Sequence, residues 1–369
     1  MKLFKCSNCG HAVYFENIYC QHCHSSLGFE TRELQLYALK PAKNKKYWLI
    51  NGNTDQTTYS YCQNHNYNVC NWLVASGSNS PFCHACELNR TIPYLGHKDD
   101  YDKWYRVETA KRRLIHSLLR FGLEVKSKST GYYDGIMFDF LSDTNAAYGT
   151  RILTGHDNGL ITINIAEADD IYREMSRNQM NEVYRTLLGH FRHEIGHYYW
   201  DILIGRTEKL CEFRTLFGDE RADYGYALNQ YYSNTNTKIW KKRFISKYAS
   251  AHPWEDWAET WAHYMHIVDT LETADSFGLN VRPKVVMPQD DMNTSFVDPY
   301  TVRNFDDIID MWLPLTFAMN SLNRSMGLRD LYPFVISKTI KEKLRFIHEI
   351  VRDAGKRETT ENSDMQREF

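Results

Sequence analysis

The chain lacks any long apolar run. No stretch of about 18 or more consecutive apolar residues occurs, so a membrane-spanning helix is not expected. The first residues read Met-Lys-Leu-Phe-Lys-Cys-Ser-Asn-Cys, and they lack the apolar segment and cleavage site of a secretory signal. We therefore expect a cytoplasmic protein with no membrane partner.

The chain also lacks an excess of charge of one sign. Lysine and arginine number 44 against 46 acidic residues, which gives a formal net charge of -2. This balance argues against a protein whose main role is to coat nucleic acid. Hydrophobic residues make up 43% of the sequence and aromatic residues 14%, so the chain has enough apolar surface to fold. Its 369 residues suit two or three structural units.

Nine cysteines are present, and in a reducing compartment they indicate metal binding rather than disulfides. Two pairs, each separated by two residues, lie ten residues apart near the N-terminus. Paired cysteines on two tight turns can complete a tetrahedral zinc site. We therefore predict a zinc ribbon over residues 1–30, with a structural zinc held by Cys6, Cys9, Cys20 and Cys23.

A second and more widely spaced group of cysteines follows. Its members are Cys62, Cys70, Cys83 and Cys86, and His65 or His84 could replace one of them as a ligand. We interpret residues 31–100 as a second cysteine-rich module with its own structural zinc. Cys211 is left over, and we expect it to be a small core residue.

The remainder predicts an α+β domain, mostly helical, over residues 101–354. Apolar residues recur at helical spacing from residue 101, and strand-like runs follow at 135–141 and 159–166. Further helices are expected at 178–204, 219–232, 254–270, 305–326 and 336–353. Strands followed by helices, rather than alternating with them, favour α+β over a parallel sheet. The polar residues 355–369 are expected to be disordered.

One of the predicted helices carries His193-Glu194-Ile195-Gly196-His197. Histidines four residues apart share one face of a helix and can bind one zinc ion. The intervening Glu194 can then act as a general base toward a water molecule that the zinc activates. This motif predicts a catalytic zinc in addition to the structural ones.

A catalytic zinc needs a third protein ligand and an open position. We favour Glu255, because His252-Pro253 marks a helix start and places Glu255 in the first turn. Glu220 and Asp223 are the competing candidates, and Glu220 in particular stays open as the third ligand.

Other side chains are assigned supporting roles around this zinc. Glu259, one turn after Glu255, is expected to orient a ligand histidine, and Asp223 is a further candidate for this task. Tyr248 is expected to donate a hydrogen bond to the oxyanion of a tetrahedral intermediate.

Peptidases commonly bind substrate as an added strand. The predicted strand at 159–166 precedes the motif helix and carries polar side chains on one face. We therefore expect a substrate-binding edge there, with Thr162 and Asn164 facing the peptide.

These features together resemble a bacterial family of zinc-ribbon-containing, zinc-binding metallopeptidases. The residues that carry the resemblance are 6–23, 83–93, 154–164, 191–201 and 252–264. More distantly, residues 248–259 are similar to part of the anthrax lethal factor protease domain, where a tyrosine precedes a zinc-binding glutamate by seven residues. This similarity implies Glu255 as the ligand, Tyr248 as the oxyanion partner and Glu259 as the orienting acid. It also implies a zincin-like fold of the gluzincin kind.

Two functions fit these observations. The first is a zinc metallopeptidase that hydrolyses a peptide or protein substrate, with Glu194 as general base. The alternative is a zinc-stabilised adaptor, whose ribbons bind a protein or nucleic-acid partner while the motif helix is inactive or regulatory.

Overall fold

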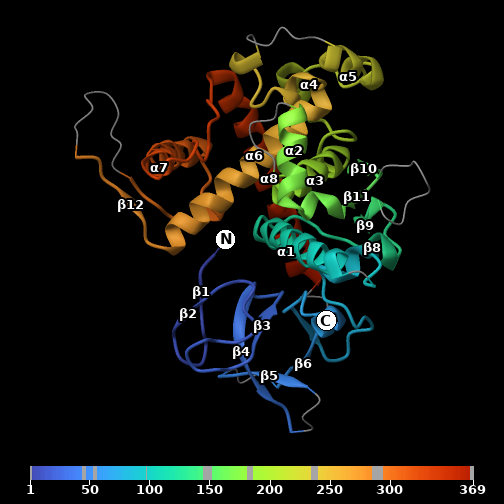
Figure 1. Cartoon of the computed structure of the whole chain (residues 1–369), viewed down its shortest axis with the longest axis vertical. Helices are drawn as coiled ribbons and strands as arrows, with labels where there is room; N and C mark the ends of the chain where they lie inside the picture. The colour runs from blue at the N-terminus through green and yellow to red at the C-terminus, as the bar shows by residue number, and fades with distance from the viewer. Residues whose placement is uncertain are drawn as a thin grey trace. The chain divides into compact units, whose positions relative to one another are not determined.

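A computed structural model describes residues 2–43, 47–52, 56–96, 98–143, 152–180, 186–233, 240–284 and 294–365. The chain forms two compact units (Figure 1). The first combines Met1–His116 with Val125–Arg173, and the second combines Ser117–Glu124 with Glu174–Phe369. Most of the helix that follows residue 100 and the strands up to residue 164 fall in the first unit, and the domain boundary at residue 100 stays a prediction.

The N-terminal unit begins with the predicted ribbon. Strand β1 (Phe4–Lys5) pairs antiparallel with β2 (Ala12–Val13). An antiparallel five-stranded sheet follows in the order β3-β4-β5-β6-β7. Its strands are β3 (Leu27–Glu30), β4 (Gln35–Pro41), β5 (Trp48–Ile50), β6 (Thr58–Tyr61) and β7 (Leu73–Ala75). Phe15, Phe29 and Trp72 are fully buried and pack against one another, so an aromatic core joins the ribbon to this sheet.

A four-stranded sheet completes the N-terminal unit, in the order β10-β11-β9-β8. Its strands are β8 (Asn89–Thr91), β9 (Met137–Leu141), β10 (Gly155–Asp157) and β11 (Leu160–Asn164). Strand β11 pairs with β10 on one side and with β9 on the other.

This arrangement contradicts the predicted substrate edge. Strand β11 carries Thr162 and Asn164, and both of its sides already hold strand partners. The amide of Asn164 instead donates to the Asp143 carboxylate at 3.0 Å and to the Ile152 carbonyl at 3.0 Å. The prediction failed because β10 covers the edge, and its short polar sequence gives a weak strand signal.

The second unit is mostly helical, which together with the sheets of the first makes the predicted α+β class correct. Its helices are α3 (Leu187–Leu203), α4 (Leu210–Phe217), α5 (Tyr224–Ser233), α6 (Pro253–Ser276), α7 (Phe305–Ser325) and α8 (Lys338–Met365). Helices α1 (Lys98–Arg120) and α2 (Asp170–Met180) each run from the first unit into the second. A short hairpin of β12 (Asn280–Val281) and β13 (Thr294–Ser295) follows α6.

Two helix predictions need correction. The single helix expected over 178–204 is interrupted, because Thr186 is extended and caps α3 through a 2.9 Å hydrogen bond from the Gly189 N–H. Residues 181–185 lie outside the described residues. Helix α8 continues to Met365, into the tail that was predicted to be disordered from residue 355. Residues 366–369 lie outside the described part.

Helices α3 and α6 pack closely at Gly196. A side-chain carbon at this position would lie 3.1 Å from the Ala258 Cα atom, so glycine lets the two backbones approach. The Trp257 indole donates to the Gly196 carbonyl at 2.8 Å. Trp257 and Trp261 are fully buried. This contact fixes the N-terminal turns of α6 against the motif helix. Among the described helices, none is long and apolar enough to cross a membrane.

Candidate metal centres

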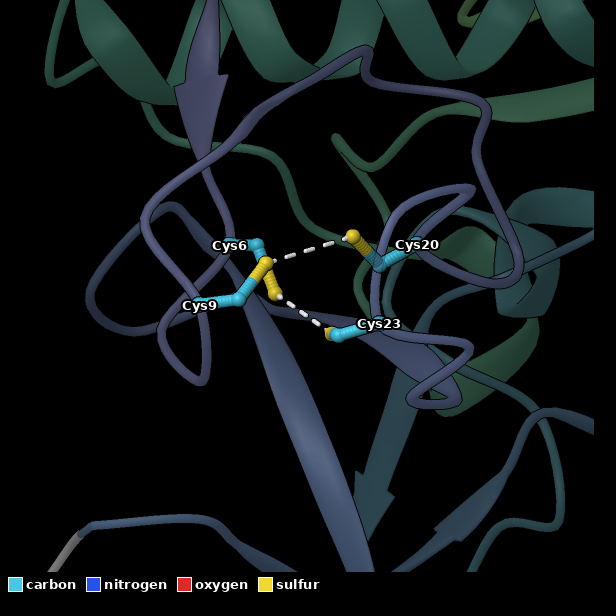
Figure 2. Close-up of side chains that lie close together, drawn as sticks. All are labelled: Cys6, Cys9, Cys20 and Cys23. Carbon is cyan, nitrogen blue, oxygen red and sulfur yellow. Dashed lines mark hydrogen bonds between the residues drawn. The ribbon is translucent and has the colours of Figure 1, made fainter.

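The ribbon cysteines converge as their spacing predicts. Figure 2 shows the Cys6 and Cys9 turn facing the Cys20 and Cys23 turn. The Sγ atoms of Cys6 and Cys23 are 3.7 Å apart, and those of Cys9 and Cys20 are also 3.7 Å apart. Ligands at the usual Zn–S length of ~2.3 Å lie about 3.8 Å apart around a tetrahedral ion. The four sulfur atoms therefore fit zinc.

The second cysteine group is equally compact. Cys62, Cys70, Cys83 and Cys86 are all buried, with their sulfur atoms within 4.8 Å of one another. The Cys70 and Cys83 sulfurs are 3.7 Å apart, which is again a zinc-like spacing. Neither histidine proposed as a substitute belongs to this group. His65 stacks on Tyr61, and its Nδ1 lies 2.8 Å from the Cys70 carbonyl oxygen.

Buried positive charge lies beside this second group. Lys111 and Arg112 on α1 are 0% and 2% exposed. Burial lowers the pKa of Arg112, but Cys70 and Cys86 oppose this effect and raise its pKa overall. Four thiolates around one zinc ion carry a net negative charge, so a buried guanidinium stabilises them by Coulomb attraction. Cys211, in contrast, is exposed, and its predicted core position is wrong.

A third group combines α3 and the start of α6. The Nε2 atoms of His193 and His197 are 3.2 Å apart. Glu255 Oε2 lies 3.0 Å from His193 Nε2, and its Oε1 lies 3.7 Å from His197 Nε2. Nitrogen and oxygen ligands at ~2.0–2.1 Å from a tetrahedral zinc lie about 3.3 Å apart. The three donors therefore match a metal site of two histidines and one glutamate.

Local structure places Glu255 at this point. His252 is the N-cap of α6 and accepts from the Trp254 N–H at 3.2 Å, and Pro253 follows it. Glu255 therefore lies in the first turn, where the helix dipole favours a negative charge. The carboxylate is 1% exposed. Burial raises the pKa of Glu255, but the two histidines outweigh burial and hold it well below its usual value.

Hydrogen bonding around His193 explains why a cation fits here. Its Nδ1 lies 2.7 Å from Glu259 Oε1, so this nitrogen carries the proton. In the neutral ring Nε2 is then an acceptor that faces the Glu255 carboxylate. Burial lowers the pKa of His193, but hydrogen bonds to Glu255 and Glu259 raise it well above its usual value. A proton or a metal ion is therefore favoured between Nε2 and Glu255.

The orienting role predicted for Glu259 agrees with this geometry. In addition to His193, Glu259 accepts a hydrogen bond from the Ser246 hydroxyl at 2.6 Å. Ser246 also accepts from the Ala249 N–H at 3.1 Å. The turn that precedes α6 thus holds the carboxylate, which in turn holds the ring of His193.

Two tyrosines lie next to the carboxylate ligand. The Tyr224 hydroxyl donates to Glu255 Oε1 at 2.6 Å. The ring of Tyr248 lies 5.9 Å from the ring of His193. Burial and the negative charges of Glu255 and Glu194 raise the pKa of Tyr248. Its hydroxyl therefore stays protonated and can donate.

Glu194 lies on α3 between the two histidines and is partly exposed. The negative charge of Glu194 contributes to the raised pKa of Tyr224 and of Tyr248. A carboxylate beside the metal donors and open to solvent can accept a proton from water.

The competing acids have other partners. Glu220 forms a two-point ion pair with Arg214, at 2.9 and 2.5 Å. Asp223 is exposed and accepts from the Tyr226 N–H at 2.7 Å, which caps α5. The prediction that Asp223 orients a ligand histidine is therefore wrong. The geometry favours Glu255 over Glu220 because only Glu255 faces the histidines.

Sequence reasoning did not identify Tyr224 or Ser246. Tyr224 is 31 residues from its partner Glu255, and the chain contains 25 tyrosines. Neither residue forms a recognisable spacing with the motif. Their roles become visible in the folded structure, where Tyr224 donates to Glu255 and Ser246 donates to Glu259.

Two regions of the chain match known protein families. Residues 100–350 match a family described as "Putative zinc-binding metallo-peptidase", and residues 3–97 match a zinc-ribbon domain. Uncharacterized proteins of Mycobacterium bovis and Mycobacterium tuberculosis are each 40% identical over 357 residues, which is 96% of this chain and 96% of each relative. No solved structure matches the chain significantly. Since the first match spans more than half of the sequence, the chain belongs to this zinc-binding metallo-peptidase family and carries the zinc ribbon at its N-terminal end.

Proposed function

We propose that the protein is a zinc-dependent peptidase whose catalytic metal is held by His193, His197 and Glu255. The observation that carries this proposal is the convergence of these three donors beside the partly exposed Glu194. Three protein ligands leave a fourth position open, as catalytic zinc sites require. When bound, zinc supplies a Lewis acid that acidifies a water molecule and polarises a substrate carbonyl.

The chain's own residues would then carry out the proton transfers. Glu194 takes a proton from the attacking water and delivers it to the leaving amine. The Tyr248 hydroxyl, protonated because its pKa is raised by burial and nearby carboxylates, donates to the oxygen that gains negative charge. Tyr224 and Glu259 position Glu255 and His193 through the hydrogen bonds described above.

The eight clustered cysteines would hold two further zinc ions with a structural role. Four thiolates occupy every position of a tetrahedral ion, so neither site can bind a water molecule for catalysis. Each site would stabilise the fold of the N-terminal unit. Reduced cysteines at zinc suit a reducing compartment, and we place the protein in the cytoplasm on this basis.

A second candidate function concerns the ribbon alone. Tyr14 and Tyr19 on the ribbon are 58% and 51% exposed, and exposed aromatic side chains often contribute to protein interfaces. We propose that the ribbon binds a protein partner. The protein substrate of the peptidase is one such partner. This role is supported if the protein no longer binds its protein partner when both tyrosines are changed to serine, while its zinc content is unchanged. Salt-sensitive binding to DNA or RNA would favour a nucleic-acid partner instead.

The peptidase proposal is tested with Glu194→Gln. Wild type is incubated with a mixed peptide library, and cleavage is followed by mass spectrometry. We expect the variant to lose at least 100-fold in rate, which is typical for the loss of a general base, while it retains all of its zinc. Glu212→Gln, a change at an exposed carboxylate on α4, is the matched control. Equal cleavage by wild type and Glu194→Gln would refute this mechanism.

A further inference from the structure

A second set of metal-binding side chains lies at the ribbon, outside its four-cysteine site. The rings of His11 and His22 stack with their centroids 3.4 Å apart and their planes 13° apart. Both histidines are exposed. A ring nitrogen of each lies within 4.8 Å of the other and of the Cys9 sulfur. Two imidazoles and a thiolate are the donor types that zinc prefers.

The ribbon turns themselves hold these histidines in place. His11 follows Cys9 by two residues, and Gly10 between them has a φ of +80°, which allows the tight turn. The Cys6 N–H donates to the His11 carbonyl at 2.8 Å. His22 lies inside the second turn, between Cys20 and Cys23, which faces the first turn in Figure 2. The two turns that collect the cysteines therefore also bring the two imidazoles together.

We propose that Cys9, His11 and His22 form a second, solvent-exposed zinc site that shares the Cys9 thiolate with the ribbon zinc. A thiolate keeps lone pairs after it binds one metal ion and can bridge to another. Four thiolates and one zinc ion carry a net charge of about -2, and this charge attracts a second cation. Solvent completes the coordination, because both imidazoles are exposed.

The small number of protein ligands at this second site predicts that its metal ion is exchangeable. The ribbon zinc has four protein ligands, whereas the second ion has three, one of them shared. We therefore expect it to bind more weakly and to leave first when free zinc is lowered. The site is independent of the proposed catalytic centre, so its test does not depend on peptidase activity.

The first experiment counts zinc per chain in the full-length protein. Samples are equilibrated in buffers of increasing free zinc and analysed by elemental mass spectrometry. Wild type is expected to bind one zinc more than the double variant His11→Ala/His22→Ala at the upper end of the range. His24→Ala is the matched control, since His24 is exposed, lies in the same ribbon and is outside the cluster. An equal zinc count in wild type and the double variant at every free zinc concentration would overturn the proposal.

A second experiment uses wild type alone and remains informative if the double variant fails to fold. Diethyl pyrocarbonate modifies free imidazoles, and peptide mapping locates the modified residues. High free zinc is expected to protect His11 and His22 at least five-fold while His24 stays reactive. Equal modification of all three histidines with and without zinc would refute the site. Titration of reactive thiols in parallel shows whether the ribbon cysteines stay bound throughout.

Discussion

The hydrogen bond from Tyr224 to Glu255 offers a sharp test of the proposed catalytic site. Tyr224→Phe removes only the hydroxyl that donates to Glu255 Oε1 at 2.6 Å. The ring remains and keeps its contacts with His252 and Trp254, whose rings lie 5.1 and 6.1 Å away. Because Glu255 is 1% exposed, its carboxylate would lose a donor that water replaces only in part.

The size of the effect follows from this geometry. A hydrogen bond to a charged group contributes about 1.5–3 kcal/mol, and each ~1.4 kcal/mol changes an equilibrium constant tenfold. Tyr224 is 37% exposed, so water can partly replace its hydroxyl and the lower figure applies. We therefore expect zinc affinity at the His193, His197 and Glu255 site to fall about tenfold, within the range for partners of metal ligands.

Competition with a chelator of known affinity measures this change. Conditions are chosen so that the cysteine-bound zinc stays in place, which parallel titration of reactive thiols verifies. Tyr226→Phe is the matched control, because Tyr226 lies on the same helix and is 65% exposed. Zinc affinity that differs by less than twofold between wild type and Tyr224→Phe would refute the role assigned to this hydroxyl.

Two further predictions concern the support of the site. Gly196→Val should lower stability by about 1–3 kcal/mol through overpacking and weaken zinc binding, because a side chain there meets Ala258 at 3.1 Å. Urea unfolding and chelator competition test it, and unchanged values for both would contradict the close approach of α3 and α6. Burial lowers the pKa of His263 to about 4. The folded protein thus binds this proton less tightly than the unfolded chain, and stability is lost as pH falls from about 6.5 to about 4. His263→Gln should weaken this acid sensitivity by up to ~3 kcal/mol, measured as the difference in unfolding free energy between pH 7.5 and pH 4.5; an identical pH profile would refute it.

Much of this structure follows from local sequence signals. The two cysteine groups were predictable because a thiolate cluster needs only short turns at the right spacing. Most helices of the second unit were also predictable, since their apolar residues repeat at the helical period. Pro253 and the His252 cap placed Glu255 in the first turn of α6, and hence near the metal donors of α3.

Features that depend on contacts between distant segments could not be predicted in this way. The pairing of β10 with β11 closed the edge that Thr162 and Asn164 were expected to offer. Asp223 became a helix cap because α5 starts directly after it. The stacked pair of His11 and His22 also has no sequence signature, because it requires the two ribbon turns to face each other.

The count of zinc ions per chain tests the central proposal most directly. Wild type, His197→Ala and Glu255→Ala are compared at a free zinc concentration low enough to leave the exposed ribbon site empty. Two zinc ions held by cysteines and one held by His193, His197 and Glu255 would give three in wild type and two in each variant. An unchanged count in both variants would contradict a metal centre on α3 and α6, and with it the proposed peptidase mechanism.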